Sequence, residues 1–562
     1  MRKLAAIRSV LVLCAALLLA IGVAACGNGD GGGTARGGEI TISQTSQPDA
    51  LDPALAYTLN AWEPMWLVYT PLLTYRHAEG DAGSELIPGL AEGLPEVSGD
   101  GKTYRLTLRE GLRYSDGSPV RASDFEHAIK RALILESGGT PYFEAIAGAG
   151  AFLEEGDSEG DISGIRADDG SGEITIELVE PDGAFSNALA MEFAALVPGD
   201  TPFENMTKNP PPGVGPYKFT KSVPNREFVM ERNGRFASFD IPDIPTGHLN
   251  KITTEIVPSL SKQTQDVIDN RLDYMQNPPV ADLKADVLAR FGPDGNEAQR
   301  YKEFTTLSTY FFFLNLRTPP FDNAKVREAV NVGVDKPALA RLYAGELDPG
   351  CSFLPPGVPG YDESVDSDCP WGDPRQQPDV ERARQLIREA GAEGAKVTIW
   401  GLTDDPAPKV VQAFADQLNE IGLDAEPRIL DGGVYFQAVG NAKTRAQAGF
   451  ANWFGDFPHP SNFFTIVDGA SIQPTNSLNL GNVDDPRINN ELAALKGEAD
   501  LEDVTDRWEE LNEYLVDKAY MVPYGYRNLA TFVSDRMNFE DCTLVHPVYG
   551  NDYSSFCLKA DE

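Results

Sequence analysis

The sequence predicts an α/β fold, and three stretches of the chain carry that prediction. Residues 38–43 (GEITIS) and 104–109 (YRLTLR) alternate apolar and polar side chains with a period of two, as half-buried strands do. Residues 379–430 instead contain two amphipathic helical patterns, each followed by a short strand pattern. Strands that alternate with helices indicate a mixed α/β architecture.

The clearest unit is the helix–strand–helix–strand stretch. Asp379 is placed to cap the first helix, and Gly391 is placed to end it. A strand at 396–400, a helix that ends at Gly422 and a strand at 424–430 follow. A strand, a helix and a second strand in this order predict a parallel pair with a right-handed crossover.

The N-terminus predicts export. Residues 1–25 begin with basic side chains and continue in an apolar run that is too short to favour a membrane-spanning helix, so we expect a signal peptide. The run ends in residues 23–27 (VAACG), which resemble a bacterial lipobox, and Cys26 would then carry lipid. An ordinary signal peptide with a chance cysteine is the alternative. The Gly-rich residues 26–38 would form a flexible tether to the membrane.

The charge excludes one class of partner. The chain has a formal net charge of −38, with 85 Asp and Glu against 47 Lys and Arg. Such an acidic surface repels phosphate backbones, so no nucleic-acid partner is expected. The composition, 42% hydrophobic and 23% charged, is that of a folded globular protein.

Four cysteines remain when Cys26 and the cysteine of the signal peptide are set aside. They permit three pairings, and the short separations favour Cys351 with Cys369 and Cys542 with Cys557 in an oxidising compartment. Free buried thiols are the alternative. No cofactor is predicted, because the histidines are scattered without metal-ligand spacing and no nucleophile motif is present.

Separated motifs along the chain match the pattern of one family in the same order. With them the chain resembles the family 5 extracellular solute-binding proteins, which include the oligopeptide- and dipeptide-binding components of bacterial ABC importers. The motifs are residues 51–53 (LDP), 71–73 (PLL), 89–92 (GLAE), 100–109 (DGKTYRLTLR), 114–120 (YSDGSPV), 122–125 (ASDF), 213–219 (GVGPYKF), 319–323 (PPFDN), 326–329 (VREA) and 453–460 (WFGDFPHP).

The resemblance implies a three-lobed α/β clamp of the periplasmic-binding-protein type, class II and large cluster C, with a hinge between two main lobes. Lobe I would combine residues 39–80, 205–305 and 523–562. The small lobe II would be residues 81–204, and lobe III would be residues 306–522.

The resemblance also implies a ligand site. The aspartate of a Trp-x-x-Asp pattern pairs with the ligand's ammonium in peptide-binding relatives, and this pattern falls on Trp453 and Asp456. A loop carboxylate bonded only to its own backbone is the alternative. The chain departs from the pattern at His459, where an acidic residue is common.

Four further positions are expected at the ligand, although a packing role is the alternative for each. The family's small lobe brings a tyrosine to the ligand backbone, and Tyr142 occupies that position. Tyr57, Asn60 and Trp62 fall where the first lobe contributes to the cleft.

The expected function is capture of a solute, most simply a short peptide, and its delivery to an ABC permease by a monomeric, lipid-anchored binding protein. The same scaffold binding an oligosaccharide or another non-peptide solute is the first alternative. A lipid-anchored secreted hydrolase is the second, and the absence of a nucleophile motif argues against it. Enzymatic activity is therefore not expected.

Overall fold

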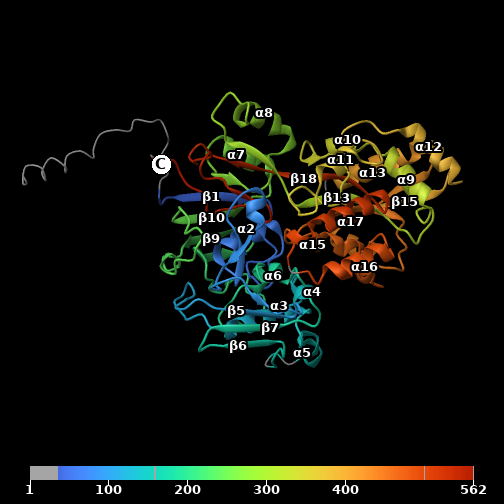
Figure 1. Ribbon diagram of the computed structural model, residues 1–562. Coiled ribbons are helices and arrows are strands. Elements are labelled where there is room, and N and C mark those ends of the chain that lie inside the picture. Colours follow the sequence, from blue (N-terminus) through green and yellow to red (C-terminus); the bar gives the residue numbers. More distant parts are fainter. Residues whose placement is uncertain (1–35, 157, 159, 405, 499, 561–562) are drawn as a thin grey trace, which may run out of the picture.

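The structure, a computed structural model, describes residues 36–156, 158, 160–404, 406–498 and 500–560. Its elements form three groups in Figure 1, a mainly blue and green group at the left, a yellow-to-red group at the right and a teal group at the bottom. All three groups contain helices and strands. The predicted α/β class is therefore confirmed.

The largest sheet has twelve strands and runs through both the left and the right groups. Its order is β16-β15-β17-β13-β18-β11-β1-β10-β9-β8, and β12 and β14 pair with β18 beside this path. We call β11 to β8 the first sheet half and β16 to β13 the second sheet half. The strands are β1 (Glu39–Gln44), β8 (Tyr217–Val223), β9 (Glu227–Arg232), β10 (Lys251–Ile256), β11 (Tyr274–Met275), β12 (Tyr301–Thr305), β13 (Ser308–Leu314), β14 (Leu347–Asp348), β15 (Lys396–Leu402), β16 (Asp424–Leu430), β17 (Ala448–Phe454) and β18 (Met521–Val533).

The first sheet half is built around the strand predicted at residues 38–43, which is β1. It runs parallel to both β10 and β11. Ile40 and Ile42 point into the core, as the alternating pattern predicts, and neither is more than 2% exposed. Because neighbours cover β1 on both edges, this strand is central to its half.

The second sheet half contains the unit predicted at residues 379–430. The Asp379 side chain accepts a hydrogen bond from the backbone N–H of Arg382 and so caps α12 (Val380–Glu389). Gly391, just beyond the helix, has a φ of +67°. After β15, α13 (Ala407–Glu420) leads to β16, and β15 and β16 are parallel. The predicted element order and parallel pairing are confirmed.

A separate four-stranded sheet forms the core of the teal group in Figure 1. Its β5 carries the predicted alternation, with Tyr104 and Leu106 buried while Arg105 and Thr107 are exposed. The half-buried strand expected here is therefore confirmed, and β4 pairs with it in antiparallel fashion. The strand order is β4-β5-β7-β6, and the helix α3 (Ser123–Ile134) contacts β6. The strands are β4 (Glu96–Val97), β5 (Thr103–Thr107), β6 (Ile165–Asp168) and β7 (Glu173–Glu177).

Most of the other helices and short strands surround these sheets. None of the helices in the described part of the chain combines the length and apolar character needed to cross a bilayer. The elements are β2 (Leu73–Tyr75), β3 (Leu86–Pro88), β19 (Val545–His546), β20 (Gly550–Asn551), α2 (Leu59–Val68), α4 (Thr140–Phe143), α5 (Ala149–Glu155), α6 (Phe185–Ala188), α7 (Leu260–Ile268), α8 (Ala281–Phe291), α9 (Ala324–Gly333), α10 (Lys336–Arg341), α11 (Glu363–Ser367), α14 (Gly432–Val439), α15 (Pro460–Phe464), α16 (Pro486–Leu495) and α17 (Thr505–Asp517).

One long strand, β18, belongs to both halves of the large sheet. Its first residues pair with β13 in the second half, and its last residues pair with β11 in the first half. The pairing with β13 shifts register between Tyr310 and Phe311, which is a β-bulge or a related irregularity. The two halves are thus joined by a continuous strand with an irregular segment near its middle.

Both predicted disulfides are present. Cys351 pairs with Cys369, and Cys542 pairs with Cys557. All four cysteines are buried. The predicted signal peptide, residues 1–25, and the predicted lipid site Cys26 lie outside the described residues.

Candidate functional site

The carboxylate of Asp456 lies in a buried turn just after β17, and only 5% of the residue is exposed. Tyr57 donates its hydroxyl to Oδ1 at 2.9 Å, and Tyr142 donates its hydroxyl to Oδ2 at 2.5 Å. The side-chain amide of Asn462 also donates to Oδ2, at 3.0 Å. Asp456 therefore accepts hydrogen bonds from three neutral side chains.

These donors come from distant parts of the chain. Tyr57 precedes α2, which contacts the first sheet half, and Tyr142 lies in α4 beside the small sheet. They are 399 and 314 residues away from Asp456 in sequence. Asn462 lies in α15, only a few residues beyond Asp456. The three groups of elements in Figure 1 thus meet at one carboxylate.

The electrostatics of this cluster favour a positively charged ligand group. Burial raises the pKa of Asp456, and the hydrogen bonds from Tyr142, Asn462 and Tyr57 oppose that rise. Burial and the nearby carboxylate also raise the pKa of both tyrosines, so their hydroxyls remain protonated donors. Among the described residues, neither Lys nor Arg forms an ion pair with Asp456. An ionised carboxylate in this position lacks the cation that buried charges normally require.

Asn462 organises the turn around Asp456, and the sequence analysis did not identify it. Its Oδ1 accepts hydrogen bonds from the Trp453 ring N–H at 2.9 Å and from the Asp456 backbone N–H at 3.1 Å. Its Nδ2 also donates to the Tyr142 hydroxyl at 3.0 Å. Asn462 therefore fixes Trp453, Asp456 and Tyr142 relative to one another. One sequence feature could have indicated this residue. Pro460 predicts the start of a helix directly after the Trp-x-x-Asp pattern, and Asn462 lies in the first turn of that helix.

The structure explains His459, which departs from the family pattern. His459 is the N-cap of α15, where its Nδ1 accepts a hydrogen bond from the Ser461 backbone N–H at 3.2 Å. Burial lowers the pKa of His459 to about 4, so the ring is neutral and can accept. An acidic side chain would also supply an N-cap acceptor. His459 thus supports the helix that holds Asn462.

Two adjoining cavities lie beside Asp456. The first, with a volume of about 500 Å³, is lined by Asp456, Tyr57, Trp62 and Arg527, and we call it the charged chamber. The second, with a volume of about 410 Å³, is lined mainly by apolar side chains, and we call it the apolar chamber. Tyr57, Asn452 and Trp453 line both. Both volumes fall in the range of roughly 300–1,000 Å³ that small-molecule sites occupy.

The other expected site residues differ in their placement. Trp62 lines the charged chamber, and its ring N–H donates to the Ala56 carbonyl at 3.0 Å. Asn60 lines neither chamber, and its backbone carbonyl accepts a hydrogen bond from the Gln44 side chain. The fold therefore brings five of the six expected residues together, and Asn60 is the one that lies outside the cluster. The five are Tyr57, Trp62, Tyr142, Trp453 and Asp456.

Arg527 is a second residue that the sequence analysis missed. It lies on β18 and lines the charged chamber, which Asp456 also lines. Its Nη2 forms an ion pair with Glu346 at 2.6 Å. A guanidinium has five N–H donors, so this ion pair leaves capacity for a ligand anion. One sequence feature could have indicated this residue: Arg527 is a charged side chain within a largely apolar strand.

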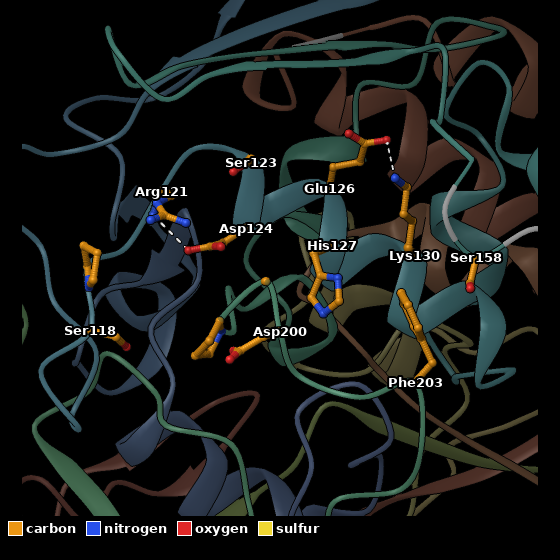
Figure 2. A pocket seen from close by; sticks show the side chains of 13 residues that line it. Ser118, Arg121, Ser123, Asp124, Glu126, His127, Lys130, Ser158, Asp200 and Phe203 are labelled. Carbon is orange, nitrogen blue, oxygen red and sulfur yellow. Dashed lines mark hydrogen bonds and ion pairs between the residues drawn. The ribbon is translucent and has the colours of Figure 1, made fainter.

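A third and larger cavity, of about 620 Å³, lies beside α3. Figure 2 shows Glu126, His127 and Lys130 along one side of that helix. Lys130 pairs with Glu126 at 3.0 Å, and a His127 ring nitrogen lies 2.9 Å from the Thr201 carbonyl oxygen. This cavity shares no lining residue with the two chambers, so it is not part of the site around Asp456.

The fold and the site together define a class of protein. Two halves of one sheet are joined by a shared strand, and a cavity beside them is lined by the Asp456 carboxylate. Tyr142, from the group of elements around the small sheet, donates to the same carboxylate. This is the periplasmic-binding-protein type of clamp, and the predicted fold is confirmed.

Comparison with known proteins identifies the family. The family model described as bacterial extracellular solute-binding proteins, family 5 Middle, matches residues 85–474, and the chain belongs to this family. The dipeptide-binding protein of Escherichia coli (strain K12) is 26% identical over 404 residues, which cover 68% of this chain and 70% of that protein. The oligopeptide-binding protein OppA of Bacillus subtilis (strain 168) is 25% identical over 474 residues, which cover 80% and 82% of the two chains.

A solved structure supports the same assignment. The structure titled clavulanic acid biosynthesis oligopeptide binding protein 2 superposes with a TM-score of 0.84 at 25% sequence identity. The match covers 93% of this chain and 96% of that chain. The protein is therefore an extracytoplasmic solute-binding protein of the kind that serves ABC importers.

Proposed function

We propose that this protein captures a short peptide outside the cell and delivers it to an ABC permease. The observation that carries this proposal is the Asp456 carboxylate, which is buried in a cleft and bonded by neutral donors but not by a protein cation. The amino terminus of a peptide supplies the missing positive charge. The dipeptide- and oligopeptide-binding relatives support the choice of a peptide.

The proposed binding geometry follows from the acceptor capacity of the carboxylate. An ionised carboxylate offers about four lone-pair sites, of which Tyr57, Tyr142 and Asn462 use three. The ligand ammonium takes the remaining site on Oδ1. Arg527 in the same chamber pairs with a carboxylate of the ligand, so the chamber complements a zwitterion.

The clamp closes over the peptide and involves no covalent chemistry. We assign lobe I to residues 39–80, 205–305 and 523–562, lobe II to 81–204 and lobe III to 306–522. Tyr57, Tyr142 and Asp456 come from these three lobes in turn, so closure assembles the site. The permease then recognises the closed form.

We also propose that the protein is a monomer anchored by lipid on Cys26. The lipobox-like residues 23–27 support this anchor. Inhibition of lipoprotein signal peptidase by globomycin should leave an unprocessed precursor of higher mass. If the protein has the same mass in treated and untreated cells, Cys26 is excluded as the lipid site.

The function is tested by the substitution Asp456→Asn, which removes the charge and keeps the shape. We expect affinity for short peptides, measured by calorimetry, to fall by about 2–5 kcal/mol, which is at least about 30-fold. Asp294→Asn, an exposed substitution of the same kind in a loop, is the matched control and should leave affinity unchanged. If Asp456→Asn binds as tightly as the wild type, the ammonium-anchor proposal is wrong.

Native mass spectrometry of protein purified without added ligand identifies the solute class directly. A retained mass that fits a short peptide supports the proposal. Trp62 and Trp453 both line the charged chamber, and aromatic rings can also stack on sugars. A retained oligosaccharide mass would therefore favour a non-peptide solute on the same scaffold.

A further inference from the structure

The apolar chamber has an unusual lining for so acidic a protein. Its walls include Phe311, Phe436, Ile466, Leu478 and Leu480. Its remaining lining side chains are neutral, and none carries a charge. The chain as a whole has 85 Asp and Glu residues, so a cavity of about 410 Å³ without one is a selective environment.

Part of this lining is exposed to solvent. Of ten large hydrophobic side chains that are exposed in the described part of the chain, four line the two chambers. Phe436 is 44% exposed and Leu478 is 48% exposed at the apolar chamber, whereas Phe454 lines the charged chamber and Tyr57 lines both. Contiguous exposed apolar surface marks binding sites, because a ligand that covers it releases water.

The wall that carries these side chains is held in place by the fold. The Tyr435 hydroxyl donates to the Phe450 carbonyl at 2.7 Å and so fixes α14, which carries Phe436. The Ser477 backbone N–H donates to the Gly440 carbonyl at 3.0 Å, and this bond ties the loop of Leu478 to the end of α14. This wall of the chamber is therefore held by hydrogen bonds within the fold.

The apolar chamber is continuous with the site of Asp456. Tyr57, Asn452 and Trp453 line both chambers, and Trp453 is fixed by its hydrogen bond to Asn462. A solute anchored at Asp456 therefore passes these shared residues to reach the apolar chamber. A charged group there would meet no ionic partner among the lining residues, whereas a bulky apolar group would cover Phe436 and Leu478.

We propose that the apolar chamber is a side-chain subsite that accepts one bulky, uncharged, apolar group of the captured peptide, such as the side chain of Leu, Phe or Trp. This inference rests on the proposed function and narrows its substrate class. The carrier thus selects peptides that combine a free amino terminus with an apolar side chain close to it.

The test uses tripeptides that share Ala-Ala-Ala as the parent and carry Leu, Phe, Ser, Lys or Glu at one position at a time. Calorimetry on the wild-type protein should find one position at which Phe or Leu binds at least about tenfold more tightly than Ser. Lys and Glu at that position should bind more weakly than Ser.

Two substitutions locate the preference in the chamber. Phe436→Ser and Leu478→Asn should each reduce the preference for Phe over Ser by several-fold and leave the affinity for Ala-Ala-Ala within about twofold. Both side chains are substantially exposed, so neither substitution removes a core residue. Val434→Asn is the matched control, because Val434 is 49% exposed on the same helix but does not line the chamber.

The outcomes separate this inference from the proposed function. Tripeptides that bind without a side-chain preference, or with a preference that Phe436→Ser and Leu478→Asn leave intact, overturn the subsite alone. Two results together would overturn the proposed function, and the subsite with it. No tripeptide of the series would bind, and Asp456→Asn would leave the amount of solute that co-purifies with the protein unchanged. A preference that is lost in both chamber variants and kept in Val434→Asn supports the subsite.

Discussion

Two buried carboxylates in this protein are held in opposite ways. Asp52 is fully buried and accepts two hydrogen bonds from the Arg131 guanidinium, at 3.0 and 2.8 Å. The backbone N–H groups of Ala54 and Met206 also donate to it, at 3.1 and 2.9 Å. Asp456 is buried to nearly the same degree, but only the neutral side chains of two tyrosines and an asparagine donate to it.

The difference separates a carboxylate that is neutralised within the protein from the carboxylate that we propose binds the ligand. Asp52 and Arg131 tie the segment before α2 to α3 of the small-sheet region, and the charge of each is neutralised within the protein. Asp456 has no such cation among the described residues, which is why we propose that a ligand supplies it. Glu63 is also buried and bonded only by neutral donors, but it lines neither chamber. The position of Asp456 in the wall of the charged chamber therefore makes it the candidate, together with its burial without a counter-ion.

The largest effect is expected when the structural carboxylate loses its cation. Arg131→Met should lower the free energy of unfolding by about 3–5 kcal/mol, because it leaves Asp52 buried and unpaired. Urea denaturation followed by circular dichroism measures this. Asp456→Asn is the contrasting variant, since burial raises the pKa of Asp456 and the ionised group opposes folding at pH 7. Its unfolding free energy should stay the same or rise, and a loss as large as that of Arg131→Met would contradict the comparison.

A second effect concerns the pH dependence of binding. Because burial raises the pKa of Asp456, its protonation begins above the pH at which an exposed aspartate protonates. Peptide affinity should therefore fall as the pH drops towards that raised pKa, and also above about pH 8, where a terminal amine loses its proton. Calorimetry from pH 5 to pH 9 at constant ionic strength checks this. The acidic fall should be absent in Asp456→Asn, and a profile that is flat in the wild type would contradict it.

The smallest effect concerns the neutral donors. Tyr142→Phe removes a 2.5 Å hydrogen bond to Asp456 but keeps the ring beside Phe457. Affinity should fall by about 1.5 kcal/mol, which is roughly tenfold. Since this bond lowers the pKa of Asp456, the acidic fall in affinity should also move to higher pH. Tyr57→Phe, which removes a 2.9 Å bond, should act in the same direction, and a tyrosine variant with neither change would show that the hydroxyl is dispensable.

The sequence predicts the parts of the fold that depend on local signals. Asp379, Gly391 and the apolar periodicity between them specify α12, and the strand patterns at β1 and β5 need only neighbouring residues. The strand β18 escaped prediction because Gly525 and Arg527 interrupt its apolar run, and its partners lie far away in the chain. The pairing that joins the two sheet halves is therefore a property of tertiary structure.

The candidate site was predictable only in part, for the same reason. Asp456, Tyr142 and Tyr57 were named through the family resemblance, since residues more than 300 positions apart show no pairing in one sequence. Asn462 follows a proline-led helix start and Arg527 interrupts an apolar strand, but neither pattern by itself marks a ligand site. Their roles depend on side chains that meet only when the three groups of elements assemble.

The shared strand β18 belongs to both sheet halves, so any opening of the cleft between them must be accommodated by this strand. The strand pairs with β13 at one end and with β11 at the other, and its regular pairing is interrupted where the register with β13 shifts. Gly525 sits there, and a Cβ at this position would come within 2.5 Å of the Asp348 carbonyl. The register shift lies between Tyr310, which lines the charged chamber, and Phe311, which lines the apolar chamber. A substitution at this point would therefore change the walls of the proposed ligand site together with the strand that joins the two sheet halves.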